Sequence, residues 1–326
     1  MPVDRSLYYG GDDWALAKKE YVATSVAAFR AKTRALDLTT RKEVSGQRSS
    51  EFIRTWLASE EAHVPGAEIS GQSIEKLPLI VYFEDKERIS YVEQSKVDAI
   101  IAHWDVRNRN AIETGSALAR AADQHVLREV VVGAATAGTG SFPGGQALTT
   151  PRTGATVALG YPLSLDGSKK MQDDIGEILQ KMLDDNVADD SEFYAFTSPY
   201  VVRVLRQDDS LLSSDYADRS LADKLNGKLL KVENCWIIPT TNLPTADYSA
   251  ATDPTIGGTG AYLANCTTLA AAIIGPDAIA SVVSPGGIDP SYDWVPTHRK
   301  WLIGAAWLKG HKAFRLESCG AIHVAG

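Results

Sequence analysis

Cysteine is scarce in this chain of 326 residues, which has only three, at positions 235, 266 and 319. The number is odd and no two of them lie close together in the sequence, so neither a disulfide framework nor a zinc knuckle is predicted. Small buried thiols in a reducing compartment explain such residues. The sequence gives no support for a secreted, disulfide-stabilised protein.

Long apolar stretches are also absent. No run approaches the ~18 consecutive apolar residues from which a bilayer-spanning helix is predicted. The segment from Met1 to Trp14 is polar and lacks the apolar core of a signal peptide. We therefore expect synthesis inside a cell and no membrane partner.

Motifs for phosphate chemistry are incomplete. His103-Trp104-Asp105 with Asn110 resembles a kinase catalytic loop, but no Asp-Phe-Gly follows and no Val-Ala-Ile-Lys strand precedes it. Residues 138–144 are rich in glycine, yet no Gly-Lys-Ser/Thr occurs there, and Pro143 lacks the N–H that would contact a phosphate. A connecting segment is the expected structure.

Metal and acid–base sites are not indicated either. The six histidines lack ligand spacings such as His-x-x-x-His, and we expect His125 to be a packed core residue. Adjacent carboxylates such as Asp173 and Asp174 point in different directions from a helix, so they are predicted to form a solvated acidic face. No catalytic residue, cofactor or metal is predicted, and we expect that the chain is not an enzyme.

The charge of the chain is unevenly distributed. Its net charge is −8, but residues 1–48 carry nine Lys/Arg against six Asp/Glu, whereas residues 166–226 carry seven against fourteen. An acidic protein gains little affinity from neutralising phosphates, so tight sequence-specific DNA binding is not expected. A container that encloses DNA without gripping it is still compatible with this charge.

Helical periodicity predicts three main helices, at residues 12–35, about 105–132 and 171–187. The second is far longer than the usual ~3 turns. Its apolar or small residues recur at helical spacing, at Ala111, Gly115, Leu118, Ala122, Val126 and Val130. Such small side chains predict that other elements pack closely against this helix.

Several shorter elements complete the pattern. Residues 133–160 are rich in Gly, Ala, Thr and Ser and are predicted to be a loop or crossover. Strands are expected at 193–197, 235–239 and 320–324, with a short helix beginning at Ser198-Pro199. The segment 301–307 fits either a helix or a strand.

Residues 46–92 are expected to form a long β-hairpin. Phe52 to Leu57 would be one strand, and Leu77 to Phe83 with Arg88 to Val92 would supply the return. Apolar residues of the return fall on both faces. Because such a ribbon is marginal alone and prone to aggregate, something must cover it. The cover is either the domain to which the hairpin belongs or another subunit.

A resemblance to a known family rests on residues 92–131. The sequence has His103 and Trp104, then Asp105-Val106-Arg107, then Ala119 and Ala121-Ala122-Asp123, followed by Val126-Leu127. This order resembles the spine helix of major capsid proteins of short-tailed, T-seven-like (podovirus-type) bacteriophages. Residues 133–170 and 245–300 show no such correspondence.

The resemblance implies an α+β tailed-phage capsid fold of the Hong Kong ninety-seven type. The expected parts are an N-terminal arm at 1–45, an extended hairpin loop at 46–85, an axial domain at 151–295, and a peripheral domain with the spine helix. The peripheral domain would comprise residues 86–150 and 296–326.

The resemblance also implies a structural function. Copies would form hexamers and pentamers that close into an icosahedral shell around double-stranded DNA. Scaffolding and portal proteins would be further partners, and the protein would be made in the host cytoplasm and reside in the virion capsid. Expected contact residues between subunits are Trp14, Phe29, Arg54, Trp56, Tyr82, Arg107 and Arg109.

Two other classes are compatible with the sequence. One is a nanocompartment shell protein of the same fold that carries enzyme cargo instead of DNA. The other is a soluble cytoplasmic α+β enzyme. A megadalton assembly would favour a shell, whereas a small oligomer that binds a nucleotide would favour the enzyme.

Overall fold

The computed structural model describes residues 12–58, 60, 62–63, 66, 71, 73–95, 105–151, 161–187, 191–208, 230–249 and 262–325. Its helices are α2 (Asp12–Lys32), η1 (Leu36–Leu38), α4 (Asp105–Ala135), α5 (Leu165–Asp184), α6 (Pro199–Leu205) and η2 (Leu316–Ser318). Its strands are β1 (Thr40–Glu43), β2 (Ser49–Thr55), β3 (Lys76–Tyr82), β4 (Arg88–Ser95), β5 (Gln146–Pro151), β6 (Phe193–Thr197), β7 (Leu230–Val232), β8 (Cys235–Pro239), β9 (Leu269–Ile274), β10 (Ile279–Val283), β11 (Asp289–Val295), β12 (Lys300–Trp307), β13 (Lys309–Ala313) and β14 (Cys319–Ala325). The mixture of helices and strands is the α+β composition that the sequence predicts.

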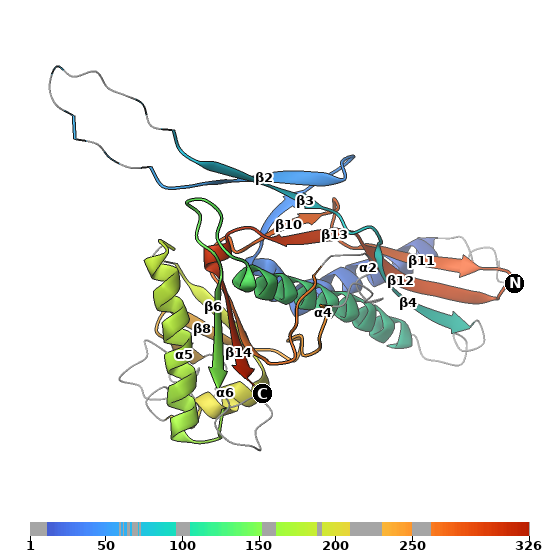
Figure 1. The fold of residues 1–326 in the computed structure, drawn as a ribbon. Coiled ribbons are helices and arrows are strands. Elements are labelled where there is room, and N and C mark those ends of the chain that lie inside the picture. The colour runs from blue at the N-terminus through green and yellow to red at the C-terminus, as the bar shows by residue number, and fades with distance from the viewer. Residues whose placement is uncertain are drawn as a thin grey trace, which may run out of the picture.

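A mixed six-stranded sheet, in the order β5-β14-β9-β6-β8-β7, lies between two layers of helices. Helices α5 and α6 cover one face, where Ile178 joins the core with Phe193 and Ile273. Helix α4 crosses the other face, where Val130 joins Ile274 (Figure 1). Strand β9 is apolar and buried throughout, as expected for a strand covered on both sides.

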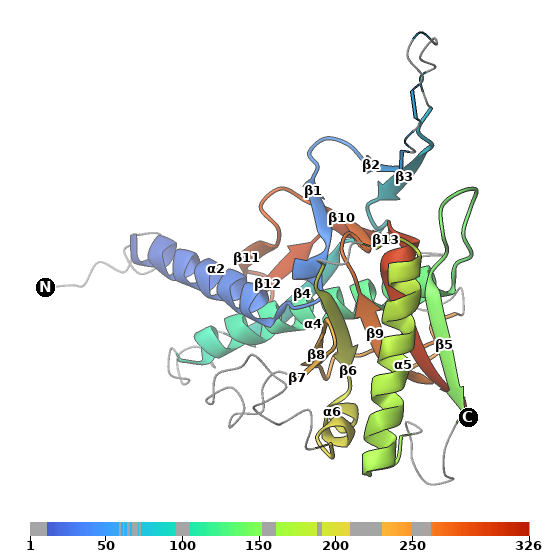
Figure 2. The same ribbon diagram turned by 90° about the vertical axis from the view of Figure 1, so that its left-hand side faces the viewer.

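Helix α4 is the expected long helix, and its 31 residues span ~46 Å. Helix α2 lies alongside it (Figure 2). A Cβ atom built on Gly115 would stand 2.4 Å from the backbone oxygen of Ser25, so α2 approaches too closely for any larger residue there. Nearby, the hydroxyls of Tyr21 and Thr114 are 3.0 Å apart. The predicted close packing against this helix is confirmed.

The antiparallel sheet β11-β12-β4 corrects the expected hairpin. Residues Arg88 to Val92 do not return along the first hairpin strand, because β4 pairs with β12 over Arg88–Ser95. Strand β12 also settles the segment 301–307 as a strand. It pairs with β11, and the opposed rings of Trp294 and Trp301 are 4.5 Å apart between centroids.

The hairpin itself consists of β2 and β3, which pair antiparallel from Ser49 opposite Tyr82 to Thr55 opposite Lys76. It lies at the outer margin of the subunit, beyond a three-stranded sheet in the order β1-β10-β13 (Figure 1). Figure 2 shows the same ribbon pointing away from the helices of the body.

Other predictions are confirmed or corrected locally. Helix α5 begins at Leu165, earlier than predicted, because Ser164 caps it by accepting a hydrogen bond from Gly167 N. Strand β5 lies in the segment expected to be a loop, where it pairs in parallel with β14. Asp174 is buried, in contrast to the predicted solvated face, and it accepts hydrogen bonds from Thr150 and Tyr161.

The sheets also show how the chain interleaves. The C-terminal strand β14 lies in the six-stranded sheet, whereas β12 pairs with β11 on one side and β4 on the other. The expected domain boundaries at 151 and 296 therefore do not coincide with the edges of sheets, and the division into domains stays a prediction. The three cysteines are buried and free, as expected.

We expect Gly115→Ala to destabilise the subunit by about 1–3 kcal/mol, because the added methyl group would force α2 away from α4. Gly176→Ala is the matched control in the interior of α5. The nearest atom to its new Cβ is the mobile end of Glu233, so replacing a helical glycine there should gain up to about 1 kcal/mol. Urea unfolding of unassembled subunits measures both, and equal effects would contradict the close-packing argument.

Candidate functional site: the hairpin and its anchor

The hairpin has two chemically different faces. Opposed residues share a face in an antiparallel ribbon, so Ile53 and Pro78 lie with Ile80 and Tyr82 on one side. Ile53 is 60% exposed, Ile80 43% and Tyr82 59%. This outward face presents apolar groups to the surroundings of the subunit.

The inward face is bound to the body. Phe52 and Val81 are buried against Ala280 and Val282 of β10, and the ring of Phe52 is 5.8 Å from that of Phe314. Burying large apolar side chains stabilises by about 1.5–3 kcal/mol each. The hairpin base is therefore docked in its own subunit, while its outward face is not.

A buried ion pair anchors the same face. Arg54 Nη2 lies 2.9 Å from Glu317 Oε2, and their side chains are only 5% and 1% exposed. Burial lowers the pKa of Arg54, and the negative charge of Glu317 opposes that shift. The guanidinium also lies over the ring of Phe142, 4.4 Å from its centroid. Because two charges removed from water need each other, this pair fixes the position of β2.

The glycine-rich segment after α4 braces the hairpin further out. Thr139 and Phe142 form an isolated antiparallel bridge, so the expected connector is a defined turn. The rings of Trp56 and Phe142 meet edge-on at 5.5 Å, and Trp56 N donates to Glu75 O at 3.0 Å. Trp56 is half-buried by these contacts.

Polar groups hold the hairpin where its second strand leaves the ribbon. Glu84 N donates to the carbonyl oxygen of Lys309 at 2.8 Å. The Glu84 carboxylate pairs with Arg88 Nε at 2.6 Å and accepts from the Tyr262 hydroxyl at 3.0 Å. His125 Nδ1 lies 3.4 Å from the same carboxylate, and the imidazole stacks on the Tyr262 ring at 4.7 Å. The expectation that His125 is a packed core residue is confirmed.

Burial changes the ionisation of groups around this network. It lowers the pKa of Lys309 to about 7 and raises that of Glu129 to about 7. It also holds the pKa values of His125 and His311 well below their usual range. Burial disfavours the charged form of each group, which explains all four directions.

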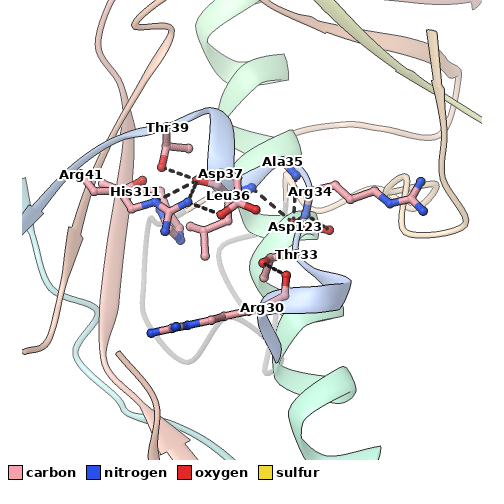
Figure 3. Close-up of polar contacts among 11 residues, drawn as sticks. Arg30, Thr33, Arg34, Ala35, Leu36, Asp37, Thr39, Arg41, Asp123 and His311 are labelled. Atoms are coloured by element: carbon pink, nitrogen blue, oxygen red, sulfur yellow. Dashed lines mark hydrogen bonds and ion pairs between the residues drawn. The ribbon is translucent and has the colours of Figure 1, made fainter. Parts of the chain in front are cut away.

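A second anchor holds the chain where it leaves α2. Asp123 of α4 is buried, and its Oδ1 accepts from the backbone N–H groups of Arg34, Ala35 and Leu36 at 3.2, 3.1 and 3.3 Å (Figure 3). Burial raises the pKa of Asp123, while these N–H groups oppose the rise by favouring the carboxylate. Arg41 adds hydrogen bonds of 3.1 and 2.8 Å to Leu36 O. One carboxylate thus ties the first helix to the long one.

The predicted contact residues occupy different environments. Tyr82 and Arg109 are exposed. Phe29 lies inside the subunit, 5.0 Å from the ring of Trp307, and Arg54 has its internal partners. The side chains of Trp14 and Arg107 lie outside the described residues. The role of all seven residues as contacts between subunits stays a prediction.

Sequence reasoning missed the groups that anchor the hairpin and the arm. Asp123 is part of the Ala-Ala-Asp motif, and its place on the packed side of a helix is the one available signal of a buried carboxylate. Glu317 and Lys309 are far from their partners in the sequence, so no local pattern identifies them.

Two observations bear on other site classes. Among the described residues, no group of three or more His, Cys, Asp and Glu side chains is arranged to hold a metal ion. None of the described helices combines the length and apolar content needed to cross a membrane.

The sequence matches the model of a known protein family. The family model described as Gp10A-like, major capsid protein, matches residues 52–283. No curated protein matches the sequence.

Solved structures resemble most of the chain. The capsid of the cyanophage P-SCSP1u matches with a TM-score of 0.73 and 22% identity, over 90% of this chain and 88% of that one. The mature capsid of bacteriophage PhiM1 matches with a TM-score of 0.68 and 14% identity, over 90% and 87%. A virus-like particle from Pyrococcus furiosus matches with a TM-score of 0.53 and 11% identity, over 94% and 98%. The expected tailed-phage capsid fold of the Hong Kong ninety-seven type is thereby confirmed.

We predict that Arg54→Met destabilises the subunit by about 3 kcal/mol, because Glu317 then keeps a buried charge without its closest buried partner. Arg315→Met is the control, since it removes the other cation near Glu317 from a partly exposed position, where loss should cost less than about 1 kcal/mol. Chemical denaturation compares them. If Arg54→Met cost no more than Arg315→Met, the ion pair would not be the anchor.

Stability should depend on pH through Lys309. Its folded pKa of about 7 lies below the ordinary lysine pKa of 10.5, so between these values only the unfolded chain binds the proton. Stability from this group is therefore complete above pH 10.5 and is lost as the pH falls towards 7. We expect Lys309→Met to raise the urea midpoint at pH 7 and to flatten its rise between pH 7 and 10.

Lys169→Met is the control for this measurement, because Lys169 is an exposed lysine on α5. It should leave the pH dependence as it is in the parent protein. An unchanged pH profile in Lys309→Met would show that the buried ammonium group does not control it.

Proposed function

We propose that this chain, which belongs to the Gp10A-like family of major capsid proteins, forms the shell of a short-tailed, T-seven-like bacteriophage. In this proposal, copies associate into hexamers and pentamers that close into an icosahedron around double-stranded DNA. The work of the protein is structural, without catalysis. The observation that carries the proposal is the two-faced hairpin, whose inner face is anchored and whose outer face exposes Ile53, Ile80 and Tyr82 beside Glu51.

The outward face supports self-association on physical grounds. A ribbon with exposed Ile53, Ile80 and Tyr82 is an aggregation hazard unless another surface covers it. Every copy of the chain carries this outward face. In the proposed contact, the face of one copy binds a different surface of the next copy. Such heterologous contacts form rings when the rotation closes, and capsomers are rings of this type.

Other parts of the proposal concern neighbours and partners. Arg109 is exposed and can pair with a carboxylate of a second subunit, and we retain Trp14, Trp56 and Arg107 as proposed contacts. Phe29 and Arg54 already have internal partners, so the proposal does not depend on them. Scaffolding and portal proteins would assist assembly, with synthesis in the host cytoplasm before the subunit enters the virion.

A nanocompartment shell is the second candidate. The likeness to the virus-like particle from Pyrococcus furiosus supports it at the level of the fold. Mass measurement of purified shells separates the two, because a phage shell formed during infection would contain DNA, whereas a compartment would contain an enzyme.

We expect Ile53→Asp with Tyr82→Asp to yield folded subunits that form no shells, because both side chains point away from the body and their loss leaves the anchored face intact. Negative-stain electron microscopy and light scattering measure assembly, and circular dichroism checks folding. The conservative pair Ile53→Val with Tyr82→Phe is the control and should assemble. Intact shells from the aspartate variant would refute the proposed use of this face.

A further inference from the structure

The paired helices α2 and α4 carry a positive surface on an acidic protein. Among the side chains described at 19–34 and 109–135, the exposed charged residues are Lys19, Glu20, Arg30, Lys32, Arg34, Arg109, Glu113 and Arg120. Six are cations and two are acids, a surplus of four positive charges in a chain whose net charge is −8. This surplus calls for a negatively charged partner.

The two exposed cations that the structure describes on α4, Arg109 and Arg120, lie on one face of the helix with Glu113 between them. Arg109, Glu113, Ser116 and Arg120 are spaced by four, three and four residues, so they share one face of the helix. Arg109 and Arg120 are eleven positions apart, which is ~16 Å along the helix axis. One strand of duplex DNA presents about five phosphates over that length.

A groove lies where this face of α4 meets the end of α2. Its volume is about 410 Å³, and its walls come from α2, α4, the start of α6 and the segment after β8. Lys32, Arg34 and Arg120 supply positive charge and Glu113 supplies one negative charge, so the lining keeps a surplus of two positive charges. Ser116 and Thr241 supply hydroxyls. The Asp123 anchor keeps α2 and α4 together beneath this groove.

The cations keep donors available for a ligand. Arg120 lies 3.8 Å from Glu113, and both are largely exposed, so this pair is weak. Arg34 Nη1 donates to the carbonyl oxygen of Pro239 at 3.2 Å, which aims the guanidinium and leaves its other N–H groups. Within the part of the chain that the structure describes, Lys32 forms no ion pair.

We propose that this groove, lined by Lys32, Arg34 and Arg120, binds phosphates of the sugar–phosphate backbone of duplex DNA. The inference rests on the proposed function, because the ligand is the DNA that the proposed shell encloses. Arg109 adds one further cation on the same face of α4, and charge spread along the helix fits a linear polyanion better than a single small anion. Two or three phosphate contacts give weak binding without sequence preference, which suits a wall that must not trap what it encloses.

The test uses purified full-length chain and a random-sequence duplex of about twenty base pairs, followed by fluorescence anisotropy between 50 and 200 mM salt. Each phosphate contact contributes about −0.9 to the slope of log affinity against log salt. Three contacts predict a loss of about forty-fold over this range. Lys32→Gln with Arg120→Gln should reduce the loss to about threefold.

The matched control is Lys169→Gln with Arg299→Gln, one exposed lysine and one exposed arginine away from the groove. It removes the same charge and should keep the parent salt dependence. Equal slopes in the two double variants would overturn the proposal, because binding would then depend on net charge alone.

Two further results would also overturn it. Inorganic phosphate that displaces the duplex at low millimolar concentration and constant ionic strength would indicate a small-anion site. Loss of shells in Lys32→Gln/Arg120→Gln with an unchanged salt slope would indicate that acidic side chains of a second copy fill the groove. The anisotropy measurement does not require an assembled shell. A failure of the parent chain to assemble would therefore refute the proposed function without deciding whether the groove binds DNA.

Discussion

Close packing against α4 is the constraint on which the other elements depend. Gly115 lets α2 approach until backbone meets backbone, and at Gly133 an added Cβ would come within 2.9 Å of the side chains of Ala313 and Cys319. Val126 and Val130 fill the space towards the six-stranded sheet. A helix with larger residues at these positions would hold its neighbours apart. The arm, the three sheets that contact α4 and the hairpin base therefore take their positions from one helix.

The hairpin shows how burial and exposure are divided within one ribbon. Alternation along β2 sends Phe52 and Arg54 inward and Ile53 outward. A buried ion pair is weak evidence for stability, because removing two charges from water is costly. The ion pair here specifies the register of β2, since a shift of β2 by one residue would expose Arg54 and bury Ile53. The anchor thus determines which face is left for a partner.

Prediction from sequence succeeded where a local period or cap determines the element. Helix α4 follows from its spacing of small residues, and α6 from Ser198-Pro199, whose hydroxyl caps the helix by accepting from Val201 N. Prediction failed where the residues that pair lie far apart in the sequence. Nothing in residues 88–92 shows that they pair with β12 instead of the hairpin, because both choices satisfy alternation.

Local sequence patterns also did not predict which polar residues are buried. Asp174 sits beside Asp173 in an acidic run, yet it is buried because Thr150 and Tyr161 come to it from elsewhere in the chain. Strand β5 was missed because its Thr and Ala residues pair with β14, which is far away in sequence. The family resemblance over 92–131 predicted the fold, whereas the anchors at Asp123 and Glu317 depend on contacts between residues distant in the sequence.

The network at Glu84 connects these features to assembly. The chain leaving β3 is bound through Glu84 N to Lys309 O, and the Glu84 carboxylate is held by Arg88 and Tyr262 inside the core. The hairpin cannot swing at this point without exposing or separating buried polar groups, each of which would cost free energy. Its apolar face is therefore held at a defined angle to the body. Repeated contacts between identical copies close into a ring only when that angle is reproduced in every copy, and open tubes result when it varies.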